Sequence, residues 1–223
     1  VVAPGSAVAQ PVSDERGSVG ASYFSDQMAT QIFSPYANVG ATLPWQLGLD
    51  LSWEADVITS ASVDVVSAAT TTISETRNEL GVKLKRELGK LELDAGYTYS
   101  TERDSDSHGV AMGGKQALWQ DNLDLGVRYA FSTNRFGYAE EPRSSWRPLT
   151  IHTVDMTVTR VVDARTVAEL ASSLFYADGF QSSVYRRVPI SLDGDLVNAT
   201  WVDEQTPATR RRAALVARVR RAL

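Results

Sequence analysis

The stretch Trp45–Val57, WQLGLDLSWEADV, alternates apolar and polar residues from its first position to its last. A β-strand points successive side chains to opposite faces, so the stretch predicts a strand with one strongly apolar face and one strongly polar face. The apolar face meets either a protein core or lipid, and the polar face meets either bulk water or a water-filled lumen. The fold class and the function both depend on which of these pairs applies.

Period-two alternation recurs along most of the chain, and each run predicts a further strand. The clearest runs are Val39–Leu43, Leu80–Lys85, Leu91–Ser100, Leu123–Phe131, Val154–Thr159 and Ala168–Tyr176. The C-terminal stretch ATRRRAALVARVRRAL fits either a basic amphipathic helix or a strand. After so many strands we favour a strand with its arginines toward the polar side. The sequence therefore predicts an all-β fold with about nine or ten strands.

The connections between these runs alternate between short and long. Short turns fall at Leu43–Pro44, Gly89–Lys90, Asp121–Asn122 and Asp163–Arg165, and long polar connections at Thr59–Ser74, Arg103–Gly114, Thr133–Pro148 and Asp178–Pro207. Outer-membrane barrels sort their connections in this way, with tight turns at one end and long loops at the other. A Greek-key sandwich has no such requirement. The pattern favours an antiparallel up-and-down transmembrane β-barrel.

Aromatic and glycine positions support lipid on the apolar side. Trp45 and Trp53 share the apolar phase, and at about 3.3 Å per residue they lie roughly 26 Å apart along a strand. After the usual tilt of about 40° the separation is roughly 20 Å, close to the apolar band of about 25 Å in a membrane barrel. Glycines fall on the polar phase, where small residues leave room in a lumen: Gly20, Gly40, Gly48, Gly81, Gly96 and Gly126. The aromatic residues that we expect at the lipid interface are Trp45, Trp53, Tyr97, Tyr99 and Tyr129.

Length and composition exclude several other classes of protein. The 223 residues suffice for one large β-domain. With 27 acidic and 22 basic residues, the chain has no basic footprint for nucleic acid. It has no cysteine and only 2 histidines, so we expect no thiolate zinc site, no histidine-rich metal centre and no cofactor. No run reaches the roughly 20 apolar residues of a spanning helix, whereas a spanning strand needs only about 9–11 alternating residues.

The first residues resemble the end of a secretory signal. Apolar Val1–Ala3 is followed by Ala7-Val8-Ala9, an Ala-x-Ala cleavage pattern, and then by a polar segment. An ordinary flexible tail is the alternative. We expect residues 1–9 to be the remaining end of a signal peptide, 10–19 to be flexible, and 20–223 to form the barrel domain, truncated at its C-terminus. The expected location is the outer membrane, with membrane lipid and envelope proteins as partners.

Motifs for metal binding or catalysis are weak. Asp104, Asp106 and His108 resemble the start of a calcium loop, but Lys115 stands where the closing bidentate Glu belongs. These three residues are the one weak candidate for a metal site, and a solvated acidic loop explains them better. His152 has no nucleophile motif beside it, and a histidine at a strand end is ordinarily a polar surface residue. We therefore expect no enzyme activity.

Charged residues on the polar phase are the main indication of function. Those that we expect to face a lumen are Asp50, Glu54, Asp56, Lys83, Lys85, Glu92, Asp94, Asp124, Arg128 and Asp155. Mixed charges either set the ion preference of a wet pore or hold a plugged interior together by salt bridges. The sequence predicts a structural or channel-like outer-membrane protein. The alternative is a soluble periplasmic β-barrel or β-sandwich that binds an apolar ligand or a protein partner.

Several stretches together resemble one family. They are DVVSAAT (64–70), ETR (75–77), DNLDLGVRYAFS (121–132), HTVDMTVTRVVDARTVAEL (152–170), DGFQSSVYRRVP (178–189) and TPATRRRAAL (206–215). In this order they are similar to the N-terminal half of an uncharacterised, domain-of-unknown-function family of bacterial outer-membrane proteins. The sequence departs at Ala68, where the family tends to have Gly, and at Val184, where it tends to have Pro; a later Tyr-Tyr-Asp strand is absent. The resemblance implies a β-barrel in a Gram-negative outer membrane and no catalytic residues.

Overall fold

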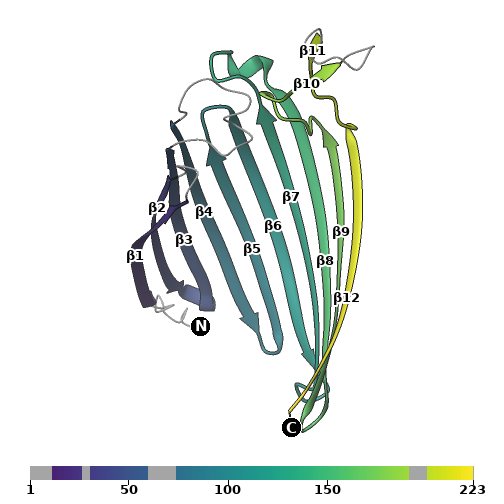
Figure 1. The fold of residues 1–223 in the computed structure, drawn as a ribbon. Helices are drawn as coiled ribbons and strands as arrows, with labels where there is room; N and C mark the ends of the chain where they lie inside the picture. The colour runs from purple at the N-terminus through teal and green to yellow at the C-terminus, as the bar shows by residue number, and fades with distance from the viewer. Residues whose placement is uncertain (1–11, 27–30, 60–73, 191–199, 223) are drawn as a thin grey trace, which may run out of the picture.

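The computed structural model describes residues 12–26, 31–59, 74–190 and 200–222. In these ranges the chain forms one curled antiparallel sheet of ten strands and a separate two-stranded sheet (Figure 1). Two short 3-10 helices, η1 (Pro44–Gln46) and η2 (Arg143–Ser145), lie in the connections of the described ranges. No helix in this part of the chain has the length and hydropathy that crossing a membrane requires.

The strands of the large sheet form an antiparallel meander. They are β1 (Ser13–Ser25), β2 (Gln31–Leu43), β3 (Leu47–Thr59), β4 (Ser74–Leu88), β5 (Leu91–Thr101), β6 (Ser105–Leu118), β7 (Leu123–Phe136), β8 (Arg147–Asp163), β9 (Thr166–Gly179) and β12 (Thr209–Arg221). Each strand pairs with the next as far as β9, which then pairs with β12. The hairpin of β10 (Arg187–Ile190) and β11 (Thr200–Asp203) lies within the connection between them. The predicted all-β antiparallel fold of about nine or ten strands is confirmed.

Tight turns join the strands at one end of the sheet. η1 joins β2 to β3, and short turns follow β4, β6 and β8. Gly89 in the turn after β4 has a φ of 64°, which glycine adopts without a steric penalty. In the turn after β8, the backbone N–H of Arg165 donates a hydrogen bond of 2.8 Å to Asp163 Oδ1. The four short turns lie where the sequence predicts them.

Long connections lie at the opposite end of the sheet, but one of the predicted ones is short. The connection between β7 and β8 covers residues 137–146, and the one between β9 and β12 covers residues 180–208. The predicted long connection over Arg103–Gly114 is wrong, because β6 begins at Ser105 and only residues 102–104 connect it to β5. Asp106 and His108 interrupt the apolar phase at the start of β6 and hide the alternation. The predicted loop between Thr59 and Ser74 covers residues 60–73, which lie outside the described residues.

The strand predicted over Trp45–Val57 begins later than its alternation suggests. β3 starts at Leu47, while Trp45 and Gln46 in η1 have φ values of 63° and 57°. Leu43 pairs directly with Leu47, so the chain reverses over three residues and needs left-handed backbone there. The expectation that Trp45 and Trp53 share one strand is therefore wrong. Trp45 lies in the turn, and its side chain is 75% exposed.

Of the two outer strands of the sheet, β1 differs from expectation and β12 agrees with it. β1 starts at Ser13, inside the stretch 10–19 that the sequence predicts to be flexible, and it pairs with β2. The predicted signal-peptide end, residues 1–9, lies outside the described residues. β12 confirms that the arginine-rich C-terminal stretch is a strand. Within the described residues β1 and β12 each pair on one side only, so the curled sheet is open between them.

Little of the described sheet is buried. The buried apolar residues are few: Ala55, Leu123, Trp146, Leu149, Ala177 and Val184. Many large apolar side chains of the strands are instead exposed, among them Leu84, Val127 and Leu174. A soluble domain normally buries such residues in a core between two packed layers. Here a single layer leaves one continuous apolar face uncovered.

Candidate functional site

The register of the sheet brings the charged residues of the polar phase onto one face. Directly paired residues of neighbouring strands lie on the same face. Asp50 pairs with Lys83, and Lys85 pairs with Asp94. The remaining predicted residues are in phase with these two pairs, so the full set lies on this polar face: Asp50, Glu54, Asp56, Lys83, Lys85, Glu92, Asp94, Asp124, Arg128 and Asp155. That the face lines a lumen stays a prediction.

Two ion pairs on the polar face reach over an intervening strand. The Arg128 guanidinium on β7 donates to Asp94 on β5 at 2.6 Å, and Gly113 of β6 lies between them in the register. A Cβ atom at Gly113 would lie 2.7 Å from Asp94 Oδ1, which is too close. Arg16 on β1 pairs in the same manner with Asp50 on β3 over Gly40. Glycine leaves the space through which each ion pair forms.

Other ion pairs near the turn end join residues of adjacent strands or of the same strand. Lys85 Nζ lies 3.3 Å from Glu92 and 3.1 Å from Glu87. Lys115 pairs with Asp124 at 2.9 Å. At the far side of the sheet, Glu169 on β9 faces two arginines of β12: Arg218 at 3.9 Å and Arg220 at 3.4 Å. These contacts are partly exposed, and surface pairs of this kind contribute about 0–1 kcal/mol each.

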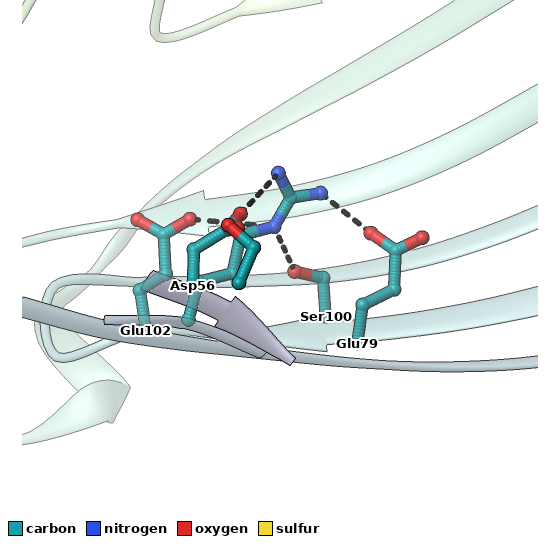
Figure 2. Close-up of polar contacts among 6 residues, drawn as sticks. Asp56, Glu79, Ser100 and Glu102 are labelled. Atoms are coloured by element: carbon teal, nitrogen blue, oxygen red, sulfur yellow. Dashed lines mark hydrogen bonds and ion pairs between the residues drawn. The ribbon is translucent and has the colours of Figure 1, made fainter. Parts of the chain in front are cut away.

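A cluster around Arg77 lies near the loop end of the polar face (Figure 2). Its guanidinium approaches Glu102 at 3.7 Å and Asp56 at 4.0 Å, it donates to Ser100 at 3.0 Å, and it pairs with Glu79. Burial and the neighbouring Asp104 raise the pKa of Glu102, whereas Arg77 lowers it, and the net direction is upward. The sequence identified only Asp56 here. The phase of β4 places Arg77 and Glu79 beside the predicted residues and could have indicated both.

The middle of the polar face is hollowed. A groove of about 460 Å³ extends from β3 to β8. Its lining includes the small residues Gly81, Gly96, Gly109, Ala111 and Ala130, the hydroxyl residues Ser52, Thr98, Ser132 and Thr153, and the charged residues Asp50, Lys83 and Arg128. Asp50 and Arg128 are paired with Arg16 and Asp94, while no described carboxylate lies within ion-pair distance of Lys83. Glycine, alanine and hydroxyl residues thus leave an open hollow beside Lys83 and the two ion pairs, and Val82, Tyr97, Val110, Phe131 and Ile151 complete its lining.

The opposite, apolar face carries four of the five predicted aromatic residues, and three of them lie beside a histidine. Trp53, Tyr97, Tyr99 and Tyr129 all lie on this face, and Trp45 lies in η1. The Tyr97 hydroxyl and His108 Nδ1 are 2.7 Å apart, and Tyr129 and His152 make the same contact at 2.8 Å. The sequence missed the role of both histidines. Their phase, which matches that of the neighbouring aromatics, was the available signal.

The weak metal candidate does not assemble. Asp106 is 2% exposed and accepts two hydrogen bonds from Arg135, at 2.9 and 2.7 Å. His108 contacts Tyr97, and Asp104 lies in the turn before β6. Among the described residues, no group of three histidine or acidic side chains is arranged to hold a metal ion. The arrangement instead neutralises a buried carboxylate with a bidentate arginine.

Two long connections pack together at the loop end. The Tyr138 and Tyr185 rings meet edge to face with centroids 5.5 Å apart, and the Trp146 ring is almost fully buried. Burial raises the pKa of Asp104, and burial together with Asp104 raises the pKa of Tyr185 to about 12. Arg103 pairs with Glu140 at 2.6 Å. The described parts of these connections thus form a cap on this end of the sheet.

The chain matches one family of proteins. The family described as "Protein of unknown function (DUF3570)" matches residues 4–223, which confirms the resemblance to a family without an assigned function. No curated protein matches the chain. Among solved structures, the chain is similar to the outer-membrane expressed OmpT of Vibrio cholerae, with 15% identity and a TM-score of 0.47. The similarity covers 89% of this chain and 62% of that one, so the chain spans less than two thirds of its length.

Proposed function

This chain belongs to the DUF3570 family, whose function is unknown, and we propose that it is part of an outer-membrane β-barrel that conducts water and small hydrophilic solutes. The apolar face meets lipid, and the hollowed polar face lines the passage. The carrying observation is the contrast between the two faces of one sheet: large apolar side chains are exposed on one, and charges surround a hollow on the other. A wet, charged interior with an apolar exterior is the arrangement of membrane barrels with channels.

The apolar face supports a lipid environment. In each of the strands β3 to β9 it carries exposed large apolar residues at alternate positions. One central row runs from Leu84 through Ala95, Met112 and Tyr129 to Val154, across five neighbouring strands. A monomeric soluble protein rarely exposes an apolar patch of more than a few hundred Å². In a bilayer the same face needs no cover, because lipid tails are as apolar as these side chains.

The polar face supports a passage rather than a plugged interior. Its middle level is lined by Gly96, Ala111 and Ala130, which pair in register across β5, β6 and β7. Small residues at one level leave the passage open there. The Arg16–Asp50 and Arg128–Asp94 ion pairs hold their charged side chains in place beside it. Lys83 stands at this level too. Charged and hydroxyl groups along a pore wall set its preference among solutes.

Export to the outer membrane is part of the proposal. The Ala7-Val8-Ala9 pattern after an apolar start is typical of a signal peptidase site. Fractionation of cells that express the protein tests this location. We expect it in the outer membrane, extractable only with detergent and migrating differently on gels when unheated. Recovery of monodisperse protein from the periplasm without detergent would establish the soluble alternative instead.

Conductance of the intact protein in a planar bilayer tests the passage. Gly96→Trp places a large side chain into the hollow, since a Cβ atom at Gly96 meets only the Val82 carbonyl at 3.4 Å. We expect wild-type protein to give conductance steps and Gly96→Trp to give smaller ones. Gly114→Trp is the matched control, because Gly114 lies on the apolar face and its Trp would point away from the hollow. Absence of steps, or equal steps in both variants, would contradict a passage along this face.

A further inference from the structure

A groove with a charged end lies on the apolar face, at the edge of the cap. It measures about 470 Å³ and lies at the loop end of β4, β5 and β6. Leu80, Val82, Tyr97 and Tyr99 line its apolar part. Arg135 and Arg143 line the end nearest the loops. The groove therefore joins an apolar channel to two guanidinium groups at the edge of the proposed lipid-facing surface.

The two arginines come from different elements and meet at one buried carboxylate. Arg135 belongs to β7 and donates hydrogen bonds from Nε and Nη2 to the two carboxylate oxygens of Asp106. Arg143 begins η2, and its guanidinium lies 3.9 Å from Asp106 and 3.4 Å from the Thr101 hydroxyl. Asp106 is 2% exposed, whereas both guanidinium groups remain about half exposed. One carboxylate thus holds two arginines in place and leaves one surplus positive charge that faces outward.

Two neighbouring carboxylates, Glu140 and Glu102, pair with other arginines. Glu140 pairs with Arg103 at 2.6 Å. Glu102 faces Arg77 on the opposite face of the sheet at 3.7 Å. Below the arginines, His108 bonds to Tyr97 and its ring lies 4.9 Å from that of Tyr99, which fixes the wall of the groove. Arginine forks match the geometry of phosphate oxygens, and the apolar part of the groove suits an acyl chain.

We propose that this groove binds one membrane lipid whose head group carries a phosphate. The phosphate lies against Arg135 and Arg143, and an acyl chain lies along Leu80, Val82 and Tyr97. The proposal rests on the proposed function, because it needs the apolar face in a membrane. Charge complementarity selects the occupant: the surplus cation lies at the polar edge of an apolar groove, where a lipid presents its phosphate.

Native mass spectrometry of the intact protein in a neutral detergent tests this site. The probes are phosphatidic acid, diacylglycerol as the same lipid without phosphate, and inorganic phosphate alone. We expect phosphatidic acid to bind in preference to diacylglycerol, and Arg143→Gln to weaken its binding about tenfold through loss of a charge-assisted contact. Arg143→Gln leaves the Asp106–Arg135 pair intact, so the variant should fold. Arg160→Gln is the matched control, since Arg160 lies on the same face beside Trp119 at the other end.

Three outcomes would overturn the lipid site. They are equal binding of phosphatidic acid by wild type and Arg143→Gln, equal binding of phosphatidic acid and diacylglycerol, and competition by inorganic phosphate at the concentration of the lipid. Each can be observed with protein that was extracted from the outer membrane, so failure of the site leaves the membrane proposal standing. Recovery of the protein without detergent would instead defeat the membrane proposal and the lipid site with it.

Discussion

At the scale of single residues, the polar face combines long charged side chains with neighbours that have no side chain. Arg128 and Asp94 contact each other only because Gly113 stands between their strands. Gly96 occupies the next level of the same face and borders the open hollow instead. Glycine thus serves two purposes on this surface: it makes room for an ion pair at one level and keeps a passage wide at another.

Substitution by valine separates these two purposes. Gly113→Val should displace the Asp94–Arg128 pair and lower the free energy of unfolding by about 0.5–1 kcal/mol more than Gly96→Val. The reason is that a Cβ atom meets Asp94 at 2.7 Å at the first position and only the Val82 carbonyl at 3.4 Å at the second. Denaturant unfolding of both variants in detergent measures the difference. Equal losses would show that the ion pair does not depend on the gap.

The sequence predicts the face of each charged residue but not its partner. Alternation alone puts Asp94 and Arg128 in the polar phase, and the register confirms that they share a face. Their contact joins residues 34 positions apart over a third strand. Such a contact depends on the curl of the sheet and on the strand order, which period-two alternation does not encode.

At the scale of elements, the cap at the loop end links two long connections to the start of β6. Asp104 precedes β6, and burial raises its pKa, as it does for Glu102. Tyr185 in the second connection stays protonated over the whole neutral range, because its pKa is raised to about 12. The two carboxyl groups are therefore the acid-sensitive part of this cap.

The packing of the cap should tighten as the pH falls. Both carboxyl groups have folded pKa values above their ordinary ones, so their stabilising contribution is complete below about pH 4 and is lost as the pH rises through the raised values. Hydrogen exchange of residues 137–146, corrected for intrinsic rates, should show greater protection at pH 4 than at pH 7. The double variant Glu102→Gln/Asp104→Asn should lose this dependence. Lower protection of residues 137–146 at pH 4 than at pH 7 in the wild type would contradict a stabilising effect of protonated Glu102 and Asp104.

Two of the differences between the predicted and observed elements share one cause. The start of β6 and the turn at η1 both lie where strands leave the apolar band. There a buried ion pair or a left-handed turn determines the backbone, and apolar alternation no longer reports it. In their middle, β5, β7 and β9 follow their predicted phases, because there apolar and polar residues alternate without interruption.

At the scale of the whole molecule, the single curled layer is the dominant feature. The Figure 1 view shows an open sheet whose long strands run between the turn end and the loop end. Neither face of this sheet contains a conventional core, so the surroundings of the apolar face decide its stability. Met112 at the centre of that face is 59% exposed.

Substitution by arginine on each face of the sheet tests whether lipid or water covers the apolar face. In a bilayer, Met112→Arg should lower the free energy of unfolding by about 2–4 kcal/mol, because a cation at mid-membrane depth is costly on a barrel exterior. Ala111→Arg is the matched control, since the neighbouring residue faces the hollow. Unfolding in lipid vesicles measures both variants. If water covered the apolar face, Met112→Arg would change the free energy by only about 0.5 kcal/mol, as exposed substitutions do.

The ion pairs that reach over glycine also bear on how the strands find their alignment. Each one involves three consecutive strands at once: an arginine, a gap and an aspartate at one level. A slip of one residue in one direction would bring Met112 to the level of Gly113, or Val39 to the level of Gly40. A slip in either flanking strand would turn a charged residue toward the apolar side. Misaligned assembly is thus penalised at two places, between β1 and β3 and between β5 and β7. These contacts therefore help to specify the strand register in a sheet that has no packed core to specify it.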